Sequence, residues 1–108
     1  MDWNVETLNT KVDEELESLE PTLLTKFLHI SEMLETYGPH KVREPYVKPL
    51  GNKLWEIRMK GKSGIARAIY VTVKERRIVV LHVFVKKTDK TPRSAINLAL
   101  NRLKEMGT

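Results

Sequence analysis

The chain contains no cysteine among its 108 residues, and aromatic residues make up only 6% of it. Without cysteine there can be no disulfide, thiolate metal site or cysteine nucleophile, and this composition is typical of the reducing cytoplasm. No segment approaches the roughly 20 consecutive apolar residues of a membrane helix, and the N-terminus lacks the basic and apolar regions of a signal peptide. We therefore expect a cytoplasmic protein that makes no membrane contact.

The charges of the chain are divided unevenly along its length. Residues 1–36 hold nine acidic and two basic side chains, a net charge of −7, whereas residues 37–108 hold five acidic and seventeen basic side chains, a net charge of +12. A hydrophobic content of 41% is enough for a packed core, and the length suits one domain that spans residues 1–108. A strongly basic segment suggests a surface that meets a polyanion, although basic domains without nucleic-acid function are also common.

The first third of the chain predicts a short strand followed by two helices. Alternating apolar residues favour a strand within residues 2–9. Apolar residues at helical spacing predict helices over 11–19 and 21–37, and Gly38 followed by proline is typical of a helix end. The helices are close enough in sequence to form a hairpin that covers a sheet.

The remainder predicts a small antiparallel sheet and a last helix. Residues 39–52 contain three prolines and are expected to form a surface loop. Three strand-like runs, the alternating 53–59 and the β-branched 65–73 and 77–85, predict an antiparallel meander that the first strand could join at one side. A last helix should have Thr91 as its N-cap and proline at its first position. We expect an α+β domain with its helices on one face of the sheet.

Few patterns in the sequence indicate a metal or cofactor site. The three histidines, His29, His40 and His82, are too scattered to show the spacing of metal ligands. No glycine-rich phosphate loop, dinucleotide-binding fingerprint or serine-nucleophile elbow is present. We therefore expect no metal and no other cofactor.

Charged side chains alternate onto one face of the expected sheet. A face covered by helices needs apolar residues, so Arg58, Arg67 and Lys86 should point to an uncovered face, with Glu56 beside them. Such cations could neutralise the transition state of RNA cleavage, in which the ribose 2′-OH attacks its own phosphate. Glu56 or His82 could then act as the general base or acid. The alternative is that these cations merely solvate an open sheet.

Further basic residues flank this face and are candidates for RNA binding. Lys87 lies at the end of the last strand, where it could meet an RNA backbone. The other candidates lie in the turns and at the start of the last helix: Lys60, Lys62, Lys90 and Arg93. Of these, Lys90 and Arg93 could equally be ordinary surface residues.

An ordered set of short motifs resembles a known family. The set runs from "LWEIRM" through "GIARAIYVTV" to "RIVVLHVFVKKTDKTPRSAINLALNRLKE", and the upstream "ELESLEPTLLTKF" and "REPYVKPL" belong to the same likeness. This combination is similar to the RelE/HigB toxin superfamily, in particular its phage-derived HigB-like branch. The resemblance covers nearly the whole chain and implies a RelE-like, microbial RNase-like fold.

The resemblance also implies a function and partners. Members of the superfamily are toxins of type II toxin–antitoxin systems that cut mRNA in the A site of the 70S ribosome without a metal. A HigA-like antitoxin with a helix-turn-helix domain neutralises the toxin, and operator DNA is bound through that antitoxin. Arg58 matches the arginine that closes the "WEIR" strand, Arg67 the arginine before "IY", and Lys86 and Lys87 the basic position after the last strand.

The chain departs from the pattern of classical RelE proteins at two places. Those proteins carry lysines on the first of these strands, where this chain has Leu54 and Glu56, and they carry a tyrosine in the last helix, which has none here. Tyr70 is a strand residue and is not an evident replacement. These departures keep open an alternative, namely a catalytically impaired RelE-like protein that binds nucleic acid or a partner.

Overall fold

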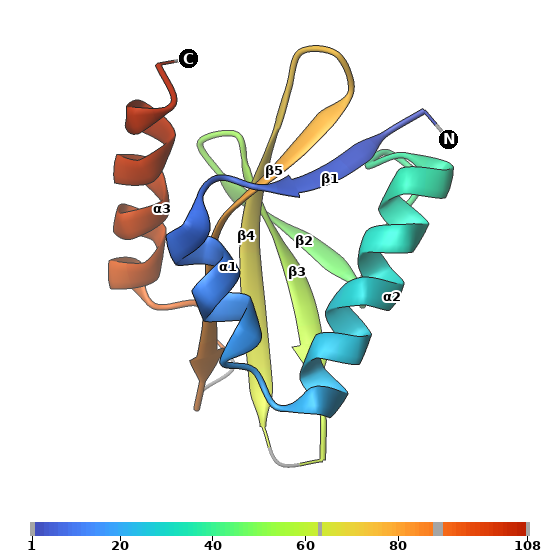
Figure 1. Ribbon diagram of the computed structural model, residues 1–108, viewed down its shortest axis with the longest axis vertical. Coiled ribbons are helices and arrows are strands. Elements are labelled where there is room, and N and C mark those ends of the chain that lie inside the picture. Colours follow the sequence, from blue (N-terminus) through green and yellow to red (C-terminus); the bar gives the residue numbers. More distant parts are fainter. Residues whose placement is uncertain (1, 63, 88–89, 108) are drawn as a thin grey trace.

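A mixed sheet with the strand order β1-β5-β4-β3-β2 forms the centre of the protein (Figure 1). The computed structural model describes residues 2–62, 64–87 and 90–107. The antiparallel meander is confirmed, whereas β1 is a parallel neighbour of β5, so the sheet is not antiparallel throughout. The strands are β1 (Asn4–Thr7), β2 (Val47–Gly51), β3 (Leu54–Lys60), β4 (Ile65–Val73) and β5 (Arg77–Lys86).

The expected helices are present in the described part of the chain. Helix α1 (Thr10–Glu17) has Asn9 as its N-cap, whose side chain accepts a hydrogen bond from the backbone N–H of Val12 at 3.1 Å. Helices α1 and α2 (Pro21–Tyr37) follow each other closely, as the hairpin prediction requires. Helix α3 (Arg93–Glu105) has Pro92 at its N-cap position, so the prediction of Thr91 as N-cap is wrong by one residue.

The helices cover both faces of the sheet, which corrects the expectation of a single covered face. One core lies under α1 and α2 and includes Leu34, Ile57 and Ala68. A second core lies under α3, where Ala95 and Ala99 pack with apolar residues of β3, β4 and β5. Figure 1 shows α2 and α3 on opposite sides of the strands, with α1 next to α3, where Glu15 contacts Arg102. Strands β4 and β5 are apolar on both faces over part of their length, which requires cover on both sides.

Strand β2 lies where a loop was predicted. It pairs antiparallel with β3, with Val47 opposite Ile57 and Pro49 opposite Trp55. Because β2 is an edge strand, one of its sides needs no hydrogen-bond partner, and a proline is tolerated there. The three prolines of this segment therefore do not exclude a strand.

The pairing of β4 with β5 shifts register between Ile69 and Tyr70, which lie opposite His82 and Val80. One extra residue, Leu81, is accommodated on β5, as in a β-bulge. Tyr70 remains in the core under α1 and α2, on the face opposite Arg67. The bulge therefore does not bring the Tyr70 hydroxyl to the charged face.

Candidate RNA-binding and catalytic site

Glu56 lies at the centre of a charged cluster on the α3 face of the sheet. Its Oε2 atom is 3.5 Å from Arg67 Nε and 3.8 Å from Arg58 Nε. Its Oε1 atom accepts a hydrogen bond from the hydroxyl of Thr91, which is the contact that Thr91 makes in place of capping α3. Arg58 and Arg67 are directly opposite each other in the β3–β4 register, which brings both guanidinium groups to one carboxylate.

The cluster is more buried than the sequence analysis expected. Glu56 and Arg67 are each 3% exposed, and Lys86 is 5% exposed. Arg67 Nη1 donates a hydrogen bond to the backbone oxygen of Ala66 at 3.0 Å. Charges can be buried only when partners compensate the lost hydration, and Glu56 supplies that compensation for Arg67. The expectation that Arg67 and Lys86 point to an uncovered face is therefore wrong.

Arg58 is the accessible arginine of the cluster. Its side chain is 27% exposed, and Arg58 Nη1 lies 3.7 Å from Glu44 Oε2 in the segment between α2 and β2. A cavity of 220 Å³ opens beside it and is lined by Pro45, Arg58, Met59, Lys60, Ile65 and Arg67. An anion in this cavity would meet Arg58 and Lys60 first, because both keep exposed surface.

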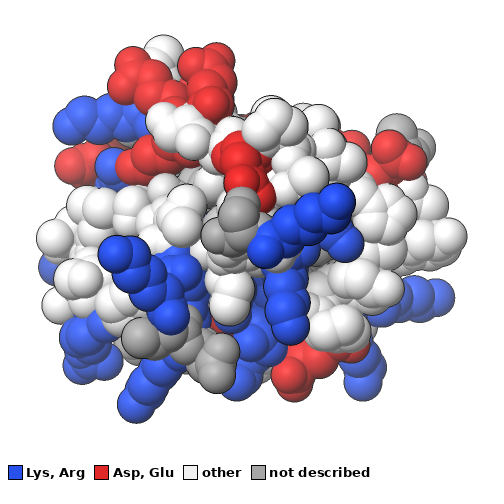
Figure 2. All heavy atoms as spheres, turned by 90° about the horizontal axis from the view of Figure 1, so that it is seen from below, with Lys and Arg blue, Asp and Glu red and all other residues white. Residues whose placement is uncertain are grey.

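Exposed basic residues gather at one end of the protein. Lysine and arginine side chains gather on the face shown in Figure 2, which views the protein from the end where the β3–β4 turn and the end of β5 lie in Figure 1. The candidates proposed for RNA binding are all exposed, namely Lys60, Lys62, Lys87, Lys90 and Arg93. Their positive charges give this end of the protein a field that attracts polyanions.

His82 is held by other partners at the junction of α1, α3 and β5. Its Nδ1 lies 3.1 Å from Glu15 Oε1, and its ring stacks on Phe84 with a centroid distance of 5.0 Å. Glu15 also accepts hydrogen bonds from Val83 N–H at 2.9 Å and from Arg102 at 3.0 Å. Burial alone would raise the pKa of Glu15, but the hydrogen bonds from Arg102, Val83 and His82 outweigh it and hold that pKa below its usual value.

This geometry narrows the choice of a general base. His82 pairs with Glu15, whereas Glu56 lies next to Arg58 and Arg67. Glu56 is therefore the better placed of the two to act as general base. Tyr70 is fully buried in the other core, and burial raises the pKa of its phenol. Thr91 and Glu44 were not predicted as partners of the cluster, because neither position carries a recognisable signal in the sequence.

The described residues contain neither a membrane-spanning helix nor a cluster of metal ligands. No helix there is both long enough and apolar enough to cross a membrane. No group of three or more His, Asp or Glu side chains in that part of the chain is arranged to hold a metal ion.

Comparison with known proteins assigns the chain to a family. The family described as "phage derived protein Gp49-like" matches residues 14–104, which is most of the chain. The chain belongs to the Gp49-like family. No curated protein matches it.

A solved structure supports the same relationship for this Gp49-like protein. A chain in the crystal structure of the archaeal RelE–RelB complex from Pyrococcus horikoshii OT3 is 28% identical and superposes with a TM-score of 0.58. The match covers 79% of the present chain and 96% of the archaeal one. The predicted membership of the RelE-type toxin superfamily and the predicted α+β fold are thereby confirmed.

Proposed function

We propose that this Gp49-like protein is the toxin of a type II toxin–antitoxin system and cleaves ribosome-bound mRNA without a metal. Membership of a RelE-type toxin superfamily supports a toxin. The observation that carries the cleavage proposal is the cavity in which Arg58 and Lys60 lie beside the Glu56–Arg67 pair. The cavity supplies cations for a phosphate, and the Glu56 carboxylate, 3.5 Å from Arg67 Nε, could accept a proton.

The reaction that fits these groups is attack of a ribose 2′-oxygen on the adjacent phosphorus, which forms a 2′,3′-cyclic phosphate and releases the 5′-oxygen as a hydroxyl that takes its proton from solvent. Arg58 and Lys60 would bind the phosphate, because they are the cations of the cavity that keep exposed surface. Arg67 and Lys86 would add positive charge as negative charge builds up on the phosphate oxygens. Glu56 would take the proton of the 2′-OH, with its position maintained by Thr91.

The partners proposed for this function are those of the superfamily. Exposed Lys62, Lys87, Lys90 and Arg93 would contact the RNA or the 70S ribosome around the A site. A HigA-like helix-turn-helix antitoxin would neutralise the toxin and carry the contact with operator DNA. The archaeal chain that this protein resembles was solved in complex with RelB, which supports a protein partner of this kind. The proposed place of action is the cytoplasm.

A second candidate function is a catalytically impaired protein that binds nucleic acid or a partner. One observation favours it: Glu56 lies between Arg58 and Arg67 and neutralises part of their charge. Arg67 is also only 3% exposed, so a phosphate in the cavity would contact little of its guanidinium group. In this case the basic end of the protein would bind RNA without cutting it.

The experiment that separates these functions is expression of the toxin alone in bacteria, with mapping of mRNA 5′ ends. We expect growth arrest and new ends that are in phase with codons. Arg58→Ala should abolish both the growth arrest and the new mRNA ends. Arg76→Ala is the control, because it removes an exposed arginine of the β4–β5 turn that pairs with Asp2, and it should leave both effects intact. If the protein causes no growth arrest and produces no mRNA ends in phase with codons, the proposed function is wrong. Purified protein that binds 70S ribosomes but leaves their mRNA whole would establish the impaired alternative.

A further inference from the structure

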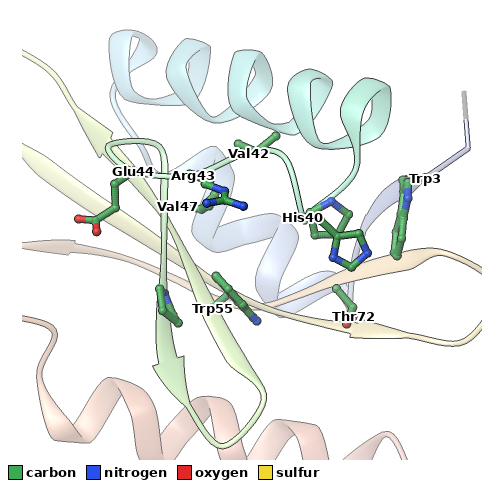
Figure 3. A pocket seen from close by; sticks show the side chains of 10 residues that line it. Trp3, His40, Val42, Arg43, Glu44, Val47, Trp55 and Thr72 are labelled. Atoms are coloured by element: carbon green, nitrogen blue, oxygen red, sulfur yellow. The ribbon is translucent and has the colours of Figure 1, made fainter.

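A second cavity lies on the α1 and α2 face of the sheet, the face opposite the Glu56 cluster. Its volume is 570 Å³, and it lies between β1, the segment that follows α2, and the β2–β3 hairpin (Figure 3). Both tryptophans of the chain line it. We call it the tryptophan pocket and define it by Trp3, His40, Val42, Arg43, Val47 and Trp55.

The tryptophan pocket is lined by apolar side chains, including Trp55 and Val47, and by the basic residue Arg43. Figure 3 shows Trp55 below Arg43 and Val47, with the side chain of His40 between Arg43 and Trp3. Glu44, the carboxylate of the lining, points away and lies 3.7 Å from Arg58 instead. The Arg43 guanidinium has no ion pair within the described part of the chain. The pocket therefore presents apolar surface beside a cation that no carboxylate among the described residues neutralises.

One wall of the pocket is formed before any ligand arrives. The backbone at Gly38 has φ +86°, and a side-chain carbon placed there would lie 3.1 Å from Trp3 Nε1, so the indole packs directly on the glycine. The Trp3 ring also meets the His40 ring edge-on at a centroid distance of 6.3 Å. A wall that is already ordered loses little conformational entropy when it binds a ligand.

We infer that the tryptophan pocket binds a segment of a protein partner that presents an apolar or aromatic side chain next to a carboxylate. The apolar side chain would contact Trp55 and Val47, and the carboxylate would pair with Arg43. This inference deepens the proposed function and rests on it, because the partner in question is the proposed antitoxin. It gives that partner a place on the opposite face from the cavity that contains Arg58.

A peptide fits the tryptophan pocket better than RNA does. An RNA backbone carries a charge at every nucleotide and is bound along a track of several cations. The pocket is lined by Arg43 and His40, whereas Lys60 lines the other cavity, and lysine and arginine side chains gather at the end of the protein shown in Figure 2. One carboxylate beside one apolar side chain matches the charge and the chemistry that the pocket provides.

The test uses the fluorescence of the two tryptophans, which both report on this pocket. An acetylated and amidated hexapeptide that contains Leu-Glu-Phe is titrated into the full chain, and a matched peptide with Leu-Lys-Phe is titrated in parallel. We expect a saturable change in emission, with the acidic peptide binding about fivefold more tightly, as expected for one solvent-exposed ion pair. Arg43→Glu should reverse this preference. Lys26→Glu, an equal change of charge on an exposed residue of α2 roughly 18 Å along the helix from Gly38, should preserve it.

Several outcomes would overturn the inference. They are the absence of a saturable change, equal binding of the two peptides, a preference that Arg43→Glu leaves unchanged, and tighter binding of AMP than of the acidic peptide. The AMP titration distinguishes a nucleotide site from a peptide site. Because the measurement involves no RNA cleavage, a protein that cuts no mRNA can still pass it, and an active nuclease can still fail it.

Discussion

Replacement of Glu56 by glutamine tests how the charged cluster is held together. The substitution keeps the shape of the side chain and an oxygen that can accept the hydrogen bond of Thr91, but it removes the negative charge. Arg67 then remains 3% exposed with its compensating carboxylate gone. Arg58 is affected less, because its side chain is 27% exposed and Glu44 lies 3.7 Å away.

The expected loss follows from this burial. Removal of one partner of a buried ion pair costs about 3–5 kcal/mol. The distances from Glu56 to the two arginines, 3.5 and 3.8 Å, are longer than those of tight ion pairs. We therefore expect the low end, a fall of about 3 kcal/mol in the free energy of unfolding. For a domain of this size that corresponds to a fall in Tm of roughly 15 °C.

The assay is urea unfolding of the wild type and three variants at pH 7. Glu44→Gln makes the same chemical change on a side chain that is 63% exposed and pairs with the same Arg58, so it should cost less than about 1 kcal/mol. Adding Arg67→Met to Glu56→Gln should recover part of the loss, because no uncompensated buried cation remains. The reasoning is refuted if Glu56→Gln costs no more than Glu44→Gln, or if the double variant is less stable than Glu56→Gln alone.

Three further predictions concern other parts of the molecule. The pKa of Glu15 is lowered in the folded state, so its contribution to the free energy of unfolding is complete above the usual pKa of 4.5 and is lost as pH falls through the folded pKa. Glu15→Gln should therefore lower the free energy of unfolding by about 2 kcal/mol at pH 7, measured by urea unfolding. This difference should shrink below pH 4.5. Gly38→Ala should lower the free energy of unfolding by about 2 kcal/mol and shift tryptophan emission, because alanine is strained at a positive φ and its side chain would displace the Trp3 indole. Gly107→Ala also places alanine at a positive φ but has open space around it, so it should leave the emission unchanged. Lys87→Ala should reduce the slope of log affinity for single-stranded RNA against log salt by about 0.7, if Lys87 contacts one phosphate; an unchanged slope would remove Lys87 from the interface.

The helices and the central strands were predictable because their signals are local. The apolar residues of α2 recur at helical spacing, and Gly38 ends that helix through a conformation that disfavours other residues. Strands β4 and β5 are rich in β-branched residues and are separated by a short turn. Such patterns determine the state of a segment without reference to distant parts of the chain.

The residues of the candidate site could be predicted from the sequence, but their burial and their contacts could not. Alternation along β3 and β4 placed Glu56, Arg58 and Arg67 on one face, and the register confirms that arrangement. Their burial was not foreseen, because it depends on where α3 and the residues before it come to lie. Thr91 shows the difference: its sequence context is that of a helix cap, yet its hydroxyl donates to Glu56. The competing contact is made by a residue 35 positions away.

By itself the sequence determined which segments form helices and central strands, and it identified the cations that share a sheet face with Glu56. Tertiary structure alone decided that β1 pairs parallel to β5, that β2 closes the other edge, and that α3 covers the face on which the charges lie. It also separated His82 from the proposed site by pairing it with Glu15, and it brought Trp3 and Trp55 to one pocket. The physical reason is that periodicity and turn propensity act over a few residues, whereas burial and ion pairing depend on contacts between segments far apart in the chain.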